Sequence, residues 1–225
     1  MNLKKLMQTA AVAFAISVPM AASASHERIM ITPTLESVVV MHHGKKVTIE
    51  RVGEKDHLIP APYNKTSRAC PPFCVQPIEV VPGVETIGEL ELLEILKRIS
   101  SGDKSYLVVD SRTPDWIARG TIPGSVNVPW NQISVENMGG MFETDEEERR
   151  FNDIMTKQFG AKKTGAGWDF SEAKTLALFC NGLWCPQSSI NIKTLVKLGY
   201  PVSKLKWYRG GMQDWVTLGF TTVKK

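Results

Sequence analysis

The sequence has no dense run of basic residues, no internal repeat and no low-complexity tract. Its formal net charge is +4 over 225 residues, which is too little for a protein that binds nucleic acid by electrostatic attraction to phosphates. After residue 24, no apolar run approaches the roughly 20 residues of a membrane-spanning helix. These absences argue against nucleic acid as a partner and against stable insertion into a membrane.

Histidine is also scarce, because the chain has four and all of them precede residue 58. The remainder contains no imidazole that could act as a general base, unless the N-terminal part folds over it. His42, His43 and His57 match no standard zinc-ligand spacing. We therefore expect no metal site and no cofactor, and a site shared by these histidines and a cysteine pair is the less favoured alternative.

The first 24 residues have the pattern of a secretory signal peptide. Lys4 and Lys5 precede an apolar stretch over residues 6–18, and residues 22–24 are small, in an A-x-A pattern. The apolar stretch is too short for a membrane anchor, and a cleavage pattern follows it directly. We expect residues 1–24 to be removed, which lowers the formal charge from +4 to +2, and we expect a periplasmic protein.

Four cysteines remain in the exported part of the chain: Cys70, Cys74, Cys180 and Cys185. An even number of cysteines in an oxidising compartment is typical of disulfide formation. Each pair is close in sequence, so pairing of 70 with 74 and of 180 with 185 is the simplest of the three connectivities. The redox state of the two pairs stays open.

Residues 25–83 differ in character from the rest and are predicted to form an N-terminal extension. Ser37–Met41 and Val47–Val52 are β-branched runs around a glycine-containing turn, which predicts a β-hairpin. Six prolines then fall between residues 60 and 82, and they leave little room for regular structure. We expect this extension to pack on a main domain formed by residues 84–225.

Residues 84–225 alternate between helical and strand patterns, which predicts an α/β fold with a mostly parallel central sheet flanked by helices. The first expected helix runs from a capping box at Thr86–Glu89 to Ile99, with Leu90, Leu93 and Leu96 facing inward. Strands are expected at 106–110, 125–128, 175–179 and 202–208, helices at 144–159 and 211–215, and a loop at 161–169. A further helix is expected from Pro186 to Gly199, with Ile190, Leu195 and Leu198 facing inward.

The stretch around Cys180 is the most informative one. An apolar strand pattern ends at this cysteine, a short loop with Gly182 follows, and Pro186 opens the next helix. The carboxyl ends of parallel strands are where ligands bind in open α/β sheets. Backbone N–H groups of such a loop and a helix N-terminus favour an anion, so we expect them to lower the pKa of the Cys180 thiol.

Four stretches in register resemble the rhodanese-like domain. They are Val109–Asp115 with its Asp-x-Arg strand end, Gly120–Pro129, Leu178–Cys180 with the following loop, and Trp207–Trp215 with its Gly-Gly-x-x-x-Trp pattern. Together they cover about residues 84–222. The resemblance implies a rhodanese-like fold and sulfurtransferase activity.

By this resemblance Cys180 is the catalytic residue that becomes a persulfide. The loop residues Asn181, Gly182, Leu183 and Trp184 would bind the substrate. The resemblance further implies a small sulfur-donor anion such as thiosulfate and a thiol acceptor as partners. Asp110 and Arg112 would form an ion pair that supports the loop without reacting.

The loop departs from the family pattern in two ways. Residues 181–186 contain no cation, and Cys185 stands where arginine is common. Cys185 could resolve a persulfide on Cys180, form a dithiol switch with it, or pack as a small apolar residue. A thiol–disulfide redox protein that exchanges with a periplasmic redox protein, and a non-catalytic binding module, are therefore the alternatives to a sulfurtransferase. A third departure is Thr121, which replaces the histidine of the Gly-His-Ile-Pro segment.

The pair Cys70 and Cys74 also has two interpretations. A local disulfide would fasten the extension, which suits an exported protein. Alternatively, this loop lies over the active site, and Cys70 or Cys74 exchanges with Cys180 or Cys185.

Overall fold

The computed structural model describes residues 29–134 and 142–224. The signal peptide expected at residues 1–24 lies outside these ranges. Within them, no helix is long and apolar enough to cross a membrane.

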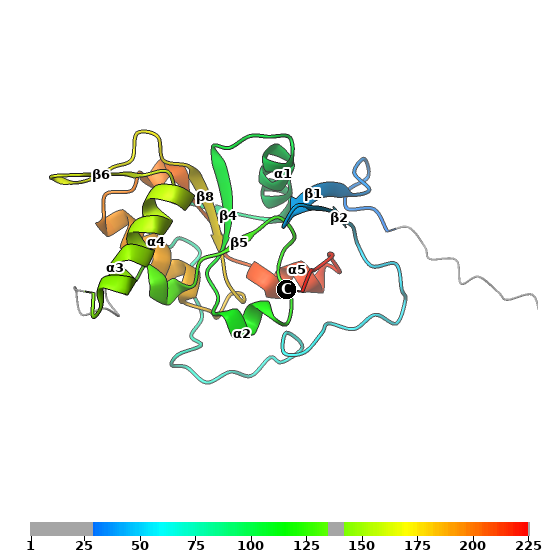
Figure 1. The fold of residues 1–225 in the computed structure, drawn as a ribbon. Coiled ribbons are helices and arrows are strands. Elements are labelled where there is room, and N and C mark those ends of the chain that lie inside the picture. The colour runs from blue at the N-terminus through cyan, green and yellow to red at the C-terminus, as the bar shows by residue number, and fades with distance from the viewer. Residues whose placement is uncertain (1–28, 135–141, 225) are drawn as a thin grey trace, which may run out of the picture.

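A five-stranded parallel sheet forms the centre of the molecule (Figure 1), in the order β3-β9-β8-β4-β5. The strands are β3 (Glu85–Ile87), β4 (Tyr106–Asp110), β5 (Val126–Asn127), β8 (Thr175–Phe179) and β9 (Leu205–Tyr208). The central strand β8 pairs with β4 and β9, and both its neighbours run parallel to it. The expected α/β class with a mostly parallel sheet is confirmed.

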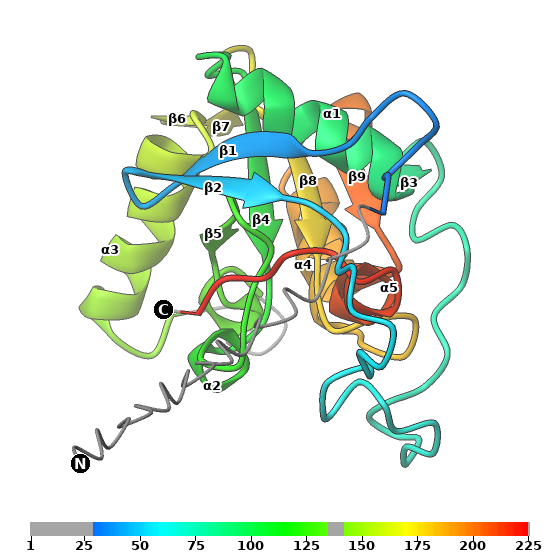
Figure 2. The same ribbon diagram turned by 90° about the vertical axis from the view of Figure 1, so that its right-hand side faces the viewer.

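Helices cover both faces of the sheet, which buries the apolar side chains of β4 and β8 on either side. On one face Leu176 and Leu178 pack with residues of α3 (Asp145–Asp153) and α4 (Gln187–Lys197). On the other face Ala177 and Phe179 pack with α1 (Glu89–Ser100), α5 (Gly211–Thr217) and the N-terminal hairpin. Figure 2 shows the hairpin lying across the side of the sheet that carries α1.

The hairpin expected in the extension is confirmed, with β1 (Val38–His42) antiparallel to β2 (Lys45–Ile49). Val38, Val40 and Ile49 are buried in the core together with α1 and α5. The extension then continues, drawn in cyan in Figure 1, past α2 (Pro114–Ile117) and α5 before it returns to β3. It therefore crosses the end of the sheet where the parallel strands finish.

Helix α1 does not begin where the capping box was expected. Thr86 lies inside β3, and the N-cap is Gly88, whose N–H donates to the Glu91 carboxylate at 3.0 Å. Leu90 is exposed, and the buried face consists of Leu92, Leu93, Ile95 and Leu96. The capping-box interpretation was wrong because pairing of β3 with β9 holds Thr86 in an extended conformation.

The segment 161–169 was expected to be a loop, and this was also wrong. Lys162–Thr164 (β6) and Gly167–Asp169 (β7) form a small antiparallel hairpin. The preceding helix α3 does begin after Thr144, whose side chain accepts from the Glu147 N–H. Its last part, Ile154–Gln158, is a π-helix.

Helix α4 buries polar residues as well as apolar ones. Ile192 and Leu195 are fully buried, whereas Ile190 and Leu198, both expected to face inward, are only half-buried. Ser188 and Asn191 are fully buried instead. The apolar periodicity of the sequence does not indicate that Ser188 and Asn191 are buried, because this helix packs beside a polar loop.

The remaining elements are short. Trp130–Gln132 and Val202–Lys204 are 3₁₀ turns. The strand expected from residue 202 therefore begins only at Leu205, after the second of these turns.

Candidate active site

Cys180 lies directly after β8, at the carboxyl end of the central strand. Cys180 and Cys185 are both free thiols, and each is only 2 % exposed. Trp184 packs against both of them and closes the loop toward the surface. The Cys185 N–H donates to the Gly182 carbonyl at 2.9 Å, which curls the loop into a tight turn.

Helix α5 fixes the other side of this loop. The N–H groups of Met212 and Gln213 donate to the carbonyls of Cys180 and Asn181, each at 3.0 Å. A side chain on Gly211, which has a φ of +57°, would collide with the Cys180 carbonyl. The Gly-Gly sequence at the start of α5 therefore permits the helix to approach the loop backbone closely.

Several hydrogen-bond donors lie around the Cys180 sulfur, and its thiol also lies 3.1 Å from the Cys185 carbonyl, to which it can donate. Burial by itself would raise the pKa of Cys180, but hydrogen bonds from Cys185, from the Ser188 side chain and backbone, and from the Gly182 backbone lower it to about 7. The Ser188 hydroxyl lies 3.3 Å from the sulfur. Trp207 Nε1 donates to the same hydroxyl at 3.0 Å, so the Ser188 proton is left to point toward Cys180. The environment thus favours a thiolate at this position.

Cys185 has the opposite tendency. Burial raises the pKa of Cys185, and the adjacent Cys180 sulfur raises it further. Its thiol lies 3.7 Å from Gln187 Oε1, which can accept a hydrogen bond from it. In this pair, Cys180 is therefore the thiol that ionises more readily.

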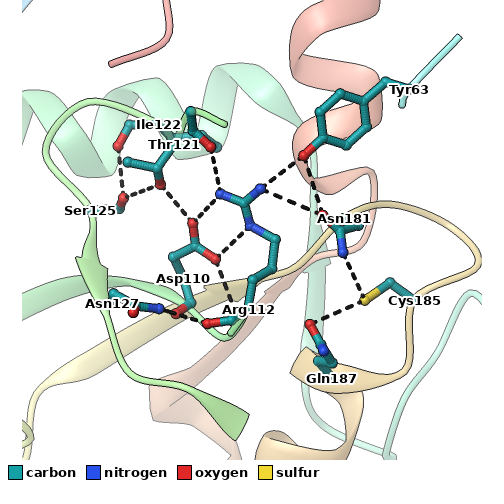
Figure 3. A network of polar contacts seen from close by, with 11 residues as sticks. Tyr63, Asp110, Arg112, Thr121, Ile122, Ser125, Asn127, Asn181, Cys185 and Gln187 are labelled. Carbon is teal, nitrogen blue, oxygen red and sulfur yellow. Dashed lines mark hydrogen bonds and ion pairs between the residues drawn. The ribbon is translucent and has the colours of Figure 1, made fainter. Parts of the chain in front are cut away.

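A fully buried ion pair lies beside the loop at the end of β4 (Figure 3). Arg112 donates to both carboxylate oxygens of Asp110, through Nε at 2.8 Å and Nη2 at 2.6 Å. Thr121 Oγ1 also donates to this carboxylate, at 2.6 Å. Arg112 keeps its charge, because Asp110 more than offsets the cost of burial and the pKa of Arg112 is raised.

Tyr63 of the extension joins this ion pair to the loop, and nothing in the sequence pattern indicated it. Its hydroxyl accepts from Arg112 Nη1 at 2.8 Å and donates to Asn181 Oδ1 at 3.2 Å. Because the Asn181 oxygen faces these groups, its amide nitrogen faces the Cys185 sulfur, 3.9 Å away. Figure 3 shows the continuous network from Asp110 to Cys185.

The extension covers the loop further along, with a segment that we call the strap, residues 63–78. The Gln76 N–H donates to the Leu183 carbonyl at 2.8 Å, and Phe73 packs edge-on against Trp184 with ring centroids 5.4 Å apart. Cys70 and Cys74 form a disulfide within the strap. The local disulfide of the first interpretation is therefore present, and the strap also lies over the loop. Exchange of Cys70 or Cys74 with Cys180 or Cys185 stays a prediction.

The four loop residues expected to bind substrate have different surroundings. Asn181 is buried in the network, Gly182 has a φ of +152° against the Gln213 side chain, and Trp184 Nε1 donates to Gln213 Oε1. Leu183 is partly exposed and bonds the strap through its carbonyl. In this closed arrangement the loop encloses the two buried cysteines.

His42, His43 and His57 contact other parts of the described chain. His42 and His43 line a cavity of about 240 Å³ together with Thr121 and Ser125, and His57 lies 3.8 Å from Glu54. Across residues 29–134 and 142–224, no group of three or more His, Cys, Asp and Glu side chains could hold a metal ion.

The model of the rhodanese-like domain family matches residues 92–218. The chain belongs to this family. No curated protein matches the chain. The rhodanese-like match begins after the strap, so Tyr63, Phe73 and Gln76 lie outside the family segment and are additions to it.

The solved structures that are similar to this rhodanese-like chain include the following three proteins. A human single-domain sulfurtransferase is 20 % identical and covers 60 % of this chain and 96 % of its own, with a TM-score of 0.38. A rhodanese-related protein from Thermoplasma volcanium is 21 % identical, over 63 % of this chain and 99 % of its own, with a TM-score of 0.36. An uncharacterized protein from Saccharomyces cerevisiae is 27 % identical, over 60 % and 93 %, with a TM-score of 0.38. The family assignment depends on the family model and not on these likenesses.

Proposed function

We propose that this protein is a sulfurtransferase in which Cys180 takes up sulfane sulfur as a persulfide and passes it to a thiol acceptor. The observation that carries the proposal is the set of donors around the Cys180 sulfur, which lowers its pKa to about 7. A thiolate is the nucleophilic form of cysteine, and here it forms without a histidine base.

The chemistry has two displacement steps. The Cys180 thiolate attacks the outer sulfur of thiosulfate, the sulfur–sulfur bond of thiosulfate breaks, and sulfite leaves with the bonding electron pair. An acceptor thiolate then attacks the terminal sulfur of the persulfide, and Cys180 leaves as a thiolate. The donors that stabilise Cys180 before the first step stabilise it again as the leaving group of the second.

A second candidate is thiol–disulfide chemistry, and the packing of two free cysteines in one cluster favours it. After deprotonation, Cys185 would attack the Cys180 sulfur of a persulfide, hydrosulfide would leave, and a disulfide between the two cysteines would form. This reaction releases reduced sulfur and leaves a disulfide that an external thiol protein must reduce.

The place of action and the partners are part of this proposal. The N-terminal pattern supports export to the periplasm, where a small sulfur-donor anion and a thiol acceptor, which a periplasmic redox protein could provide, would meet the protein. The sealed state of Cys180, which is 2 % exposed, requires that the cover of the loop moves before either can react.

Mass spectrometry distinguishes these functions. The protein, with Cys180 and Cys185 reduced, is exposed to thiosulfate or to polysulfide and then digested. A mass gain of one sulfur on the peptide with Cys180 is the expected result. Loss of two hydrogens that links Cys180 to Cys185 would favour the redox function. No change, with Cys180→Ser identical to wild type, would refute both and leave a binding module.

A further inference from the structure

Arg68 of the strap lies on the outer face of the active loop. Its guanidinium carbon is 3.6 Å from the centroid of the Trp184 ring, and Trp184 in turn packs on Cys180 and Cys185. Burial lowers the pKa of the Arg68 guanidinium, and the neighbouring Tyr63 and Cys185 side chains offset part of this effect. A cation from the extension is therefore placed where the loop has none of its own.

The hydrogen bonds of this guanidinium are incomplete. Nη2 donates to the carbonyls of Pro62 at 2.9 Å and Lys65 at 3.3 Å, which fixes the side chain in place. Nε is buried and has no partner. A buried donor without a partner is uncommon, and an ion is one of the groups that satisfy such donors. Among the described residues, no carboxylate forms an ion pair with Arg68.

The other arginines around the loop are engaged differently. Arg112 donates to Asp110 through Nε and Nη2 and to the Tyr63 hydroxyl through Nη1, and it is fully buried. Arg209 donates to the strap carbonyls of Gln76 and Pro77 and lies near Asp214, and Arg119 stacks on Trp116. Residues 181–186 carry no charged side chain. Arg68 is thus a cation that lies directly on Trp184 and forms no ion pair with the described residues.

We propose that Arg68 binds the anionic end of the sulfur donor, and this inference rests on the proposed sulfurtransferase function. In thiosulfate, three oxygens carry the charge and surround the sulfur that is lost as sulfite. A guanidinium binds such oxygens with charge-assisted hydrogen bonds. Arg68 therefore holds the donor by the group that leaves, beside Trp184, and the outer sulfur reaches Cys180 when the cover of the loop has moved. Donor specificity then depends on a residue outside the family segment 92–218.

A kinetic experiment with two donors tests this role. Thiosulfate is anionic, whereas diallyl trisulfide supplies sulfane sulfur without a charge. Arg68→Met keeps an unbranched side chain on Trp184 but removes the charge, and Arg68→Lys keeps the charge. We expect Arg68→Met to raise KM for thiosulfate by about 10-fold to 100-fold, as for loss of a charged hydrogen bond. Its kcat/KM for diallyl trisulfide stays near that of wild type, and Arg68→Lys recovers part of the thiosulfate KM.

The control variant is Arg98→Met. Arg98 also lies over an aromatic ring, that of Tyr106 at 5.4 Å, but Tyr106 opens β4 at the opposite end of the sheet. The Arg98→Met variant loses one positive charge without a change at the loop, so its KM for thiosulfate should equal that of wild type. An equal loss of kcat/KM for both donors in Arg68→Met would overturn the inference, because Arg68 would then only pack on Trp184.

A binding experiment separates this inference from the proposed function. Thiosulfate is titrated calorimetrically into Cys180→Ser, and into the same variant with Arg68→Met. Binding that weakens about 10-fold or more without Arg68 supports the anion site even if the wild-type protein transfers no sulfur. Equal affinity in the two proteins, or no binding to either, would overturn it, whatever the outcome for persulfide formation.

Discussion

The hydroxyl of Ser188 should control the protonation of Cys180. Trp207 donates to Ser188, and Ser188 in turn donates to the Cys180 sulfur at 3.3 Å. A hydrogen bond to a charged group contributes about 1.5–3 kcal/mol, and one pKa unit corresponds to about 1.4 kcal/mol. Ser188→Ala should therefore raise the pKa of Cys180 by about 1–2 units above its wild-type value of about 7.

The assay is the rate of alkylation of Cys180 by iodoacetamide as a function of pH, with the modified peptide identified by mass spectrometry. Since only the thiolate reacts, the wild-type rate should rise through pH 7 and then level off. In Ser188→Ala the rise should be displaced to higher pH, so that the rate at pH 7 falls about 5-fold to 50-fold. Cys185 should not obscure the profile, because its pKa is raised.

Ser189→Ala is the matched control. Ser189 is the next residue, and it is also buried, but its hydroxyl donates to Pro186 and Gln76 and makes no contact with the thiol. Its alkylation profile should coincide with that of wild type. A Ser188→Ala profile with an unchanged midpoint, or an equal displacement in Ser189→Ala, would refute the relay from Trp207 to Cys180.

Three further substitutions test the network and the strap. Asp110→Asn leaves Arg112 charged and unpaired, so the free energy of unfolding in urea should fall by about 3–5 kcal/mol. Tyr63→Phe leaves an Arg112 donor and the Asn181 acceptor without their shared partner and should cost about 1–3 kcal/mol in the same measurement. Replacing Cys70 and Cys74 by serine removes a short closed loop worth about 2 kcal/mol, so native-state alkylation of Cys180 should accelerate by up to about 30-fold.

Controls for these substitutions come from exposed positions. Glu146→Gln breaks an exposed ion pair with Arg150 and should cost less than about 1 kcal/mol. If Asp110→Asn cost no more than this control, the buried pair would not hold the end of β4. If alkylation were equally slow with and without the strap disulfide, the strap would not be the cover that limits access to Cys180.

The sheet and the position of Cys180 follow from local patterns. Apolar runs such as 175–179 are long and continuous, and a strand that ends at a cysteine places the thiol at the edge where parallel strands finish. The ion pair of Asp110 and Arg112 was expected from the resemblance of the Asp-x-Arg strand end to the family pattern, and it is present. Signals of this kind need only neighbours in sequence.

The contribution of the strap could not be predicted in the same way. Tyr63 bonds Asn181 across 118 positions, and no periodicity relates two such distant residues. Its proline-rich surroundings indicated only the absence of regular structure. The charge of Arg68 was visible in the sequence, but its stacking on Trp184 depends on the path of an irregular segment. Short elements such as β6 and β7 were missed because three residues give too little pattern.

The hydrogen bond between Tyr63 and Asn181 joins segments that are synthesised at different times. A chain is made from its N-terminus, so Tyr63, Cys70 and Cys74 leave the ribosome more than 100 residues before the loop at 180–185 exists. The buried network can close only when Asn181 has been made. The loop is then still not held in place, because the N–H groups of Met212 and Gln213, which bind its carbonyls, come later in the chain. The site is therefore assembled from both ends of the chain and is complete only when α5 has been made.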